Sequence, residues 1–270
     1  MRVRTFRSNI VGQKAETIDW RPLLPSWFAV ITVIVAAAGT PSALAAKAAT
    51  TTIPIVFAIA VDPVELGLVT SVNRPGANLT GVTNLNVEVG PKRLELLHEL
   101  LPTATTIAVL VDPTSPTLSE AYLSSLQTAA PTFGLQLYVL HASTEAEIEA
   151  AFVTVQQRRA GALVIGPRTF FNSRAETLAA LSLRYTVPTI YQFRRFVAAG
   201  GLVSYGSGDE TEFYRLVGIY AGKILNGDKP ANLPVQQTTT FELIVNLKTA
   251  KALGITVPQS VQSRANEVIE

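Results

Sequence analysis

The sequence predicts an α/β protein built from two lobes, each with a parallel sheet flanked by helices. From about residue 30 onward, short β-branched runs alternate with Ala- and Leu-rich stretches of helical length, which is typical of parallel sheets covered by helices. Most of these runs are apolar throughout, as expected of strands buried on both faces. A length of 270 residues suits two such lobes better than one.

The elements follow one another in a regular order, and most strands end at a turn that contains Pro, Gly or a polar residue. Strands are expected at 30–37, 53–60, 78–84, 105–112, 135–142, 162–167, 188–193 and 202–207. Helices are expected at 41–50, 63–73, 90–101, 116–130, 144–159, 172–185 and 209–226. The last third differs, because 235–248 has strand character with no helix before it, and amphipathic pieces follow at 248–254 and 259–269.

The stretch VITVIVAAAGTPSALAAKA, residues 30–48, has two incompatible interpretations. Its apolar run and the small residues 43–45 resemble the core and cleavage site of a secretion signal. However, the region before it contains Glu16 and Asp19, whereas signals are short and basic. The βαβ pattern continues directly into 53–60, and parallel neighbours need a crossing helix at 41–50. We therefore interpret the run as a buried strand followed by a loop and a helix start.

Composition limits the function. The 22 basic and 20 acidic residues leave a net charge of +2 with no basic block, which argues against nucleic acid as a partner. There is no Cys, and His98 and His141 lie far apart in the sequence, so neither a metal nor another cofactor is expected. No apolar stretch reaches the length of a membrane span.

Three turns place a polar residue directly before proline, which favours a capped helix start. They are Thr40-Pro41-Ser42, Asp62-Pro63 and Asp112-Pro113. A helix N-terminus attracts anions, and in parallel sheets ligands bind where strands end. The first turn is the best candidate, because Gly39 precedes it and two hydroxyls accompany it. Asp62 is expected to cap a helix or to pair with a ligand ammonium, and Asp112 only to cap.

Aromatic residues near other strand ends are candidates for a pocket wall, although such residues also pack against neighbouring elements. They are Phe170, Phe171, Tyr191, Phe193 and Tyr205. Catalytic signatures are missing: there is no G-x-S-x-G elbow, and the run from Gly218 to Lys223 lacks the spacing and the hydroxyl residue of a phosphate loop. The sequence therefore favours a binding protein over an enzyme.

Three extended segments carry a family resemblance over residues 30–270. They begin with TPSALAAKAATTTIPIVFAIAVDPVELGLV, FFNSRAETLAALSLRYTVPTIYQF and KPANLPVQQTTTFELIVNLK. These segments resemble the substrate-binding proteins of a bacterial ABC-transporter family that includes tryptophan-type binding proteins. The resemblance implies the type I periplasmic binding fold, in which two Rossmann-like lobes close on a small solute. It also implies an ABC permease as partner and a periplasmic location, although residues 1–29 show no convincing export signal.

The resemblance also implies how the chain divides and binds. Residues 1–29 would be a segment foreign to the family, 30–112 with 233–270 lobe 1, and 113–232 lobe 2. The Thr40-Pro41-Ser42 turn would receive a ligand carboxylate, with Asp62-Pro63 beside it. The second lobe would contribute Tyr191, Phe193, Tyr205 and Gly206.

Two departures from the family pattern bear on this expectation. Relatives begin with a strand, a helix and another strand before the segment that resembles residue 30, so lobe 1 is expected to be incomplete. Relatives often carry acids where Arg168 and Arg195 stand here. If these arginines face the cleft, the ligand preference moves toward anions, and Arg195 is expected to face solvent.

The leading hypothesis is therefore a solute-binding component of an ABC transporter that binds a small carboxylate-bearing molecule, such as an amino acid. The first alternative is a degraded or truncated paralogue that binds nothing, which the expected gap in lobe 1 favours. The second is an α/β enzyme, because doubly wound folds host many reactions, but no nucleophile, base or metal set supports it.

Overall fold

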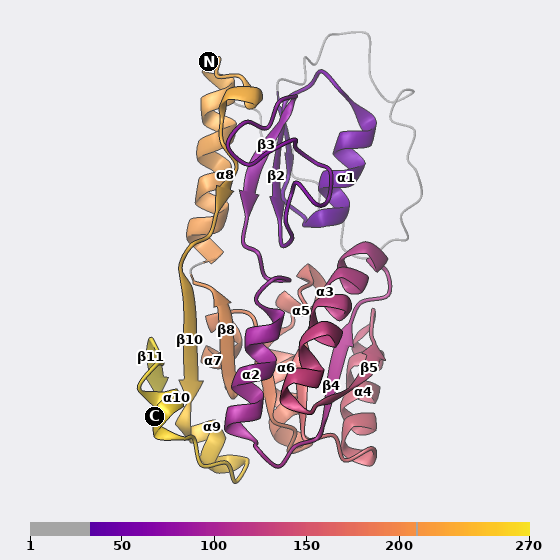
Figure 1. The fold of residues 1–270 in the computed structure, drawn as a ribbon, viewed down its shortest axis with the longest axis vertical. Coiled ribbons are helices and arrows are strands. Elements are labelled where there is room, and N and C mark those ends of the chain that lie inside the picture. The colour runs from indigo at the N-terminus through magenta and orange to yellow at the C-terminus, as the bar shows by residue number, and fades with distance from the viewer. Residues whose placement is uncertain (1–32, 209) are drawn as a thin grey trace. The chain divides into compact units, whose positions relative to one another are not determined.

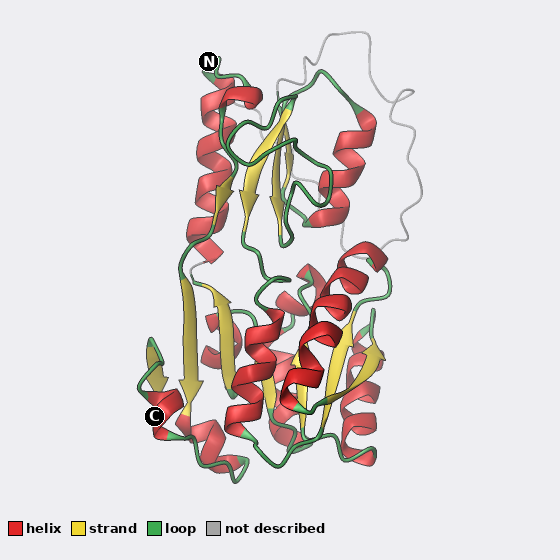
Figure 2. Ribbon diagram, viewed as in Figure 1, coloured by secondary structure: helices red, strands yellow, loops and turns green. Residues whose placement is uncertain are grey.

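The computed structural model describes residues 33–208 and 210–270, which form two β-sheets with helices packed against them (Figures 1 and 2). The expected foreign segment, residues 1–29, and the signal-peptide question lie outside the described residues. The predicted fold class is confirmed: the sheets are almost wholly parallel, and helices flank them.

The first sheet has four parallel strands in the order β1-β2-β3-β9. These are β1 (Ile34–Ala36), β2 (Ile55–Ile59), β3 (Leu79–Thr83) and β9 (Gln236–Gln237). Strands β2 and β3 are buried at every position, which explains their lack of alternation. Helix α1 (Thr40–Ala49) makes the crossing from β1 to β2, as predicted.

The second sheet has seven strands in the order β11-β10-β8-β7-β6-β4-β5. They are β4 (Thr106–Val111), β5 (Gln136–His141), β6 (Ala162–Ile165), β7 (Thr189–Tyr191), β8 (Val203–Ser207), β10 (Phe241–Asn246) and β11 (Glu267–Ile269). Strand β10 runs antiparallel to β8, and the other pairs are parallel.

The remaining helices lie between these strands in the chain. They are α2 (Gly90–Leu100), α3 (Pro116–Ala129), α4 (Glu145–Gln157), α5 (Thr169–Asn172), α6 (Ala175–Arg184), α7 (Arg194–Ala198), α8 (Glu210–Leu225), α9 (Leu247–Ala252) and α10 (Gln259–Gln262). Within the described residues there are also two 3₁₀ turns, Ala130–Phe133 and Pro230–Asn232. Thr144 and Glu147 form the capping box that starts α4.

The predicted lobe boundaries need correction. Strand β4, expected in lobe 1, lies inside the seven-stranded sheet, and so do β10 and β11 of the segment 233–270. Helix α8, expected in lobe 2, lies beside β3 (Figure 1). Its Phe213, Val217 and Tyr220 pack against β2 and β3. Sequence order does not reveal this exchange, because the chain passes between the sheets after β3, after β8 and after β9.

The predicted helix at 63–73 is also wrong, since residues 63–67 form only turns. The Leu68 N–H donates to the Pro63 carbonyl at 2.8 Å, a six-residue closure of the kind that ends helices. The segment therefore forms a single turn, and the chain continues without regular structure to β3.

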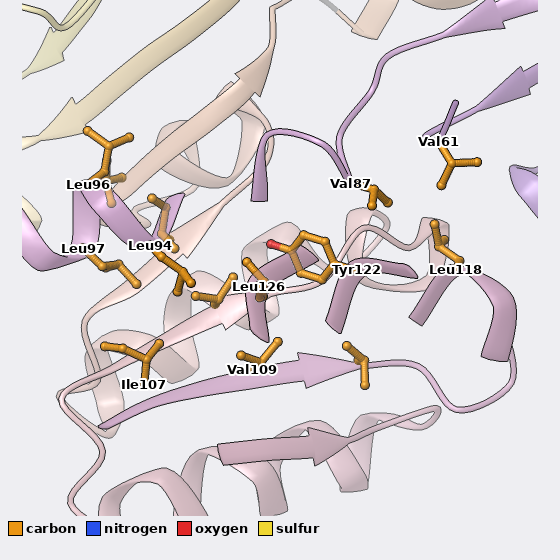
Figure 3. Close-up of a cluster of buried hydrophobic side chains, with 14 of the residues drawn as sticks. Val61, Val87, Leu94, Leu96, Leu97, Ile107, Val109, Leu118, Tyr122 and Leu126 are labelled. Atoms are coloured by element: carbon orange, nitrogen blue, oxygen red, sulfur yellow. The ribbon is translucent and has the colours of Figure 1, made fainter. Parts of the chain in front are cut away.

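Apolar side chains of α2 and α3 pack on one face of the larger sheet (Figure 3). Leu94 and Leu97 of α2 and Tyr122 and Leu126 of α3 are almost completely buried. Burying a side chain of this size contributes about 1.5–3 kcal/mol. This core anchors the segment 84–89, which connects β3 to α2 and carries part of the site described below.

Candidate ligand-binding site

A cavity opens where strands β1, β2, β3, β6 and β7 end at their carboxyl termini. The space inside it is about 530 Å³ when the open solvent at its mouth is included. Both sheets contribute, as expected for ligands of parallel α/β folds. Its polar lining consists of Thr40, Asn84, Asn86, Arg168, Thr169, Asn172 and Glu210.

Thr40 is the most informative residue of this lining. The structure corrects its predicted role: α1 begins at Thr40 itself, and Gly39 is the N-cap at φ 87°, a conformation that favours glycine. The Thr40 side chain is 1% exposed, and its hydroxyl has no hydrogen-bond partner among the described residues. Buried hydroxyls are normally paired, so a polar group from outside the chain is the expected partner.

The rest of the first turn has local roles. The Ser42 hydroxyl donates to the Gly39 carbonyl at 2.7 Å. Pro41 is exposed, and neither residue lines the cavity. Of this turn, Gly39 and Thr40 therefore face the site.

Two asparagines follow β3 at the base of the cavity. Asn84 is 6% exposed, and its Oδ1 accepts the Asn86 backbone N–H at 3.3 Å. Their side-chain NH₂ groups form no hydrogen bond within the described part of the chain. The motif analysis missed both residues, although polar side chains directly after a buried strand are a usable signal.

Arg168 enters the cavity wall from the loop after β6. Its Nε donates to Asp112 Oδ2 at 2.7 Å, and the Asp112 side chain is 3% exposed. Asp112 also accepts the Thr114 backbone N–H through Oδ1. The following helix α3 begins at Pro116 with Ser115 as its N-cap, so the predicted role of Asp112 as a helix cap is wrong. Arg168 therefore faces the cleft, but its charge is balanced by a buried carboxylate.

Arg195 does not line this cavity, in agreement with its predicted exposure. It pairs with Glu210 of α8 and donates to the Asn172 carbonyl. Glu210 therefore belongs both to this ion pair and to the lining of the cavity.

The aromatic wall differs from the prediction. Phe193 lines the cavity as predicted, together with Phe213 and Tyr214 of α8, which the sequence analysis did not single out. Partial burial and the nearby Glu210 carboxylate raise the Tyr214 pKa. Aromatic rings on two walls can hold the body of an apolar or aromatic ligand.

The other predicted aromatic residues lie elsewhere. Tyr191 is completely buried, its ring stacks on Phe196 at 4.7 Å, and burial raises its pKa. Phe170 packs beneath the Arg174 guanidinium. The Tyr205 ring stacks on Phe241 instead of lining the cavity.

Position 206 has no room for a side chain, so only glycine fits there. A Cβ atom there would lie 2.1 Å from the Gln192 carbonyl oxygen and 2.8 Å from Asn86 Oδ1, distances that real Cβ atoms do not show. Gly206 therefore lets the end of β8 approach the base of the cavity without lining it.

Asp62 borders a second, adjoining cavity, which Thr40 and Glu88 also line. Asp62 Oδ1 accepts the Val64 N–H at 2.7 Å and so closes a turn, although no helix follows for it to cap. Pro63 is buried and lines neither cavity. Within residues 33–208 and 210–270, no group of three metal-ligating side chains is present, and no helix is long and apolar enough to cross a membrane.

The comparisons with known proteins agree with this architecture. A family model described as ABC transporter substrate binding protein matches residues 30–269. A curated "Tyrosine-binding protein" of Clostridioides difficile is 30% identical over 82% of this chain, and the match spans 63% of that relative. The chain thus covers less than two thirds of that relative's length.

Two solved structures are similar to this chain. A domain from Streptococcus pneumoniae described as an ABC domain in complex with L-Trp is 27% identical, with a TM-score of 0.75, covering 88% of this chain and 81% of that one. A conserved domain protein from Vibrio cholerae is 29% identical with the same TM-score of 0.75, covering 88% of this chain and 78% of that one.

Proposed function

Because this chain belongs to the ABC transporter substrate-binding protein family, a family of binding proteins and not of enzymes, we propose that it binds an amino acid in the cavity at the start of α1. The relatives support the ligand class, since one is named for tyrosine and another is described with L-Trp.

The observation that carries the proposal is the unpartnered, buried Thr40 hydroxyl at the first residue of a ten-residue helix. The positive end of the helix dipole and this hydroxyl together favour an anionic group. The α-carboxylate is therefore placed here, and the NH₂ groups of Asn84 and Asn86 add further donors beside it.

The opposite walls fit the rest of an amino acid. Glu210 is the acidic residue of the lining, and it can attract the ligand ammonium. Phe193, Phe213 and Tyr214 can contact an apolar or aromatic side chain. Binding contacts from both sheets would stabilise a closed arrangement in preference to an open one.

The proposal extends to the transport role. A non-catalytic receptor of this family would deliver its solute to an ABC permease from the periplasm. Both the permease and the compartment are inferences from family membership.

Isothermal titration against a panel of amino acids tests the proposal. We expect tyrosine, tryptophan or a similar amino acid to bind, and the matched amines tyramine and tryptamine, which lack the carboxylate, to bind at least tenfold more weakly. Absence of binding by a folded sample would favour the non-binding paralogue. Equal binding of the amines would contradict the placement of the carboxylate.

A further inference from the structure

The largest completely buried polar side chain of the described residues is that of Arg93 in α2. Its guanidinium has no carboxylate within ion-pair distance in residues 33–208 or 210–270. A buried charge of this kind is costly unless hydrogen bonds satisfy it, so its partners identify what this cation stabilises.

The Arg93 partners are four oxygen atoms, two of which belong to the cavity-lining residue Asn86. Nε donates to the Tyr205 carbonyl at 2.7 Å, and Nη1 donates to the Asn86 carbonyl at 2.9 Å. Nη1 also donates to the Tyr122 hydroxyl at 3.2 Å, and Nη2 donates to Asn86 Oδ1 at 2.8 Å. Arg93 thus contacts both the main chain and the side chain of Asn86, and it fastens the segment after β3 to the end of β8.

These contacts determine which way the Asn86 amide points. A guanidinium has only donors, so the amide atom that faces it must be the oxygen. The Asn86 NH₂ group is then directed away from Arg93. Asn86 lines the cavity, and its NH₂ group has no partner among the described residues.

We propose that Arg93 is a positioning residue that locks the Asn86 amide with its NH₂ group facing the cavity, where this group donates a hydrogen bond to a ligand oxygen. The proposal rests on the proposed function for the presence of a ligand, but the locked amide is a property of the free protein. Through this amide, the uncompensated charge of Arg93 also favours an anionic ligand group.

The first test needs no ligand and compares Asn86→Asp with Asn84→Asp. Both asparagines are buried and line the cavity, but only Asn86 contacts a cation. We expect N86D to keep the melting temperature within about 3 °C of the wild type, because the introduced carboxylate would pair with Arg93. N84D buries an unpaired carboxylate, and its melting temperature should fall by roughly 5–10 °C. Equal losses in the two variants would overturn the contact with Arg93.

The second test measures affinity by titration with the tightest amino acid of the panel. N86D replaces the donor with an acceptor, so we expect about tenfold weaker binding or more in a folded protein. Wild-type affinity for N86D would overturn the donor role.

A double-mutant cycle separates positioning from mere structural support. Arg93→Lys keeps the charge but cannot form the forked contact, and it should weaken binding about threefold to tenfold when Asn86 is present. In an Asn86→Ala background the same change should alter affinity less than about twofold. Equal effects in both backgrounds would contradict the proposal. The exposed Arg184→Lys, paired with Glu149, is the matched control and should bind as the wild type does.

The two proposals fail in different ways. If the wild type binds no member of the panel, the proposed function fails, and the stability comparison of N86D with N84D still decides whether Arg93 holds the amide. If the wild type binds and N86D is unaffected, the inference fails and the proposed function stands.

Discussion

The turn after β1 and the turn after β4 have almost the same sequence pattern, a polar residue followed by proline, but opposite hydrogen-bonding states. At the first turn, the buried Thr40 hydroxyl has no partner among the described residues. At the second, Asp112 accepts from the Thr114 N–H, the Thr114 hydroxyl and Arg168 Nε. The difference teaches that hydrogen-bond saturation, not the sequence motif, separates a structural turn from the turn for which we propose a ligand.

A substitution at Asp112, in the turn after β4, should have the largest effect, which is on the free energy of unfolding. Asp112→Ala leaves Arg168 and the Thr114 N–H without their acceptor, and removing one partner of a largely buried ion pair is strongly destabilising. Because Arg168 remains 21% exposed, we expect a loss of about 2–3 kcal/mol in the free energy of unfolding, measured by chemical denaturation. Asp228→Ala, at an exposed position, should change it by less than about 0.5 kcal/mol. Equal stability of D112A and the wild type would remove the contrast between the two turns.

The contrast also shows what the sequence could and could not predict. Buried strands β2 and β3 and the capping box of α4 follow from local patterns, and these were confirmed. A cavity lies at strand ends, where the sequence predicts a ligand site, and it is lined by Asn84 and by Phe213 of α8 but not by Tyr191. The position of α8 depends on packing against β2 and β3, a contact between distant parts of the chain that no local pattern encodes.

The same limit explains the error at residues 63–73. The composition of this segment allows a helix, and Asp62 closes its first turn. The turn ends at the local closure from the Leu68 N–H to the Pro63 carbonyl. Whether a helix forms instead also depends on the tertiary contacts of the following loop, which override local propensity.

A substitution at Thr40, in the turn after β1, should weaken ligand binding moderately and leave stability almost unchanged. Thr40→Val replaces a buried, unpartnered hydroxyl with a methyl group of similar volume, so the free energy of unfolding should stay equal or rise slightly. A hydrogen bond to a charged carboxylate contributes about 1.5–3 kcal/mol, so amino-acid affinity should fall about tenfold by titration. In the control Thr154→Val, the lost hydroxyl donates to the Ala150 carbonyl in a solvent-exposed hydrogen bond of α4, and affinity should not change. A T40V protein that is destabilised but binds normally would make Thr40 a structural residue like Asp112.

The third turn, at Asp62 after β2, should give the smallest effect, which is a pH dependence of the free energy of unfolding. Glu88 accepts the Asp62 N–H at 2.8 Å, and burial, with smaller contributions from the Asp62 and Glu65 charges, raises the Glu88 pKa above its ordinary value of 4.5. The folded state therefore holds this proton to higher pH than the unfolded state does, and stability falls as the pH rises from about 4.5 through the raised pKa. Glu88→Gln keeps an acceptor for Asp62 but does not titrate.

We therefore expect E88Q to match the wild type near pH 4 and to be more stable near pH 7. Although burial around the carboxyl group raises the Glu88 pKa, the residue as a whole is exposed, so solvent screening limits this gain to about 0.3 kcal/mol. Glu147→Gln is the control of opposite sign: hydrogen bonds from Ser143 and Thr144 lower the Glu147 pKa, so this variant should lose stability relative to the wild type near pH 7 and recover it as the pH falls through the ordinary carboxyl range. Denaturation curves at both pH values distinguish the two variants. An E88Q curve with the same pH dependence as E147Q would show that the Asp62 turn stabilises the charged Glu88 carboxylate, contrary to the raised pKa.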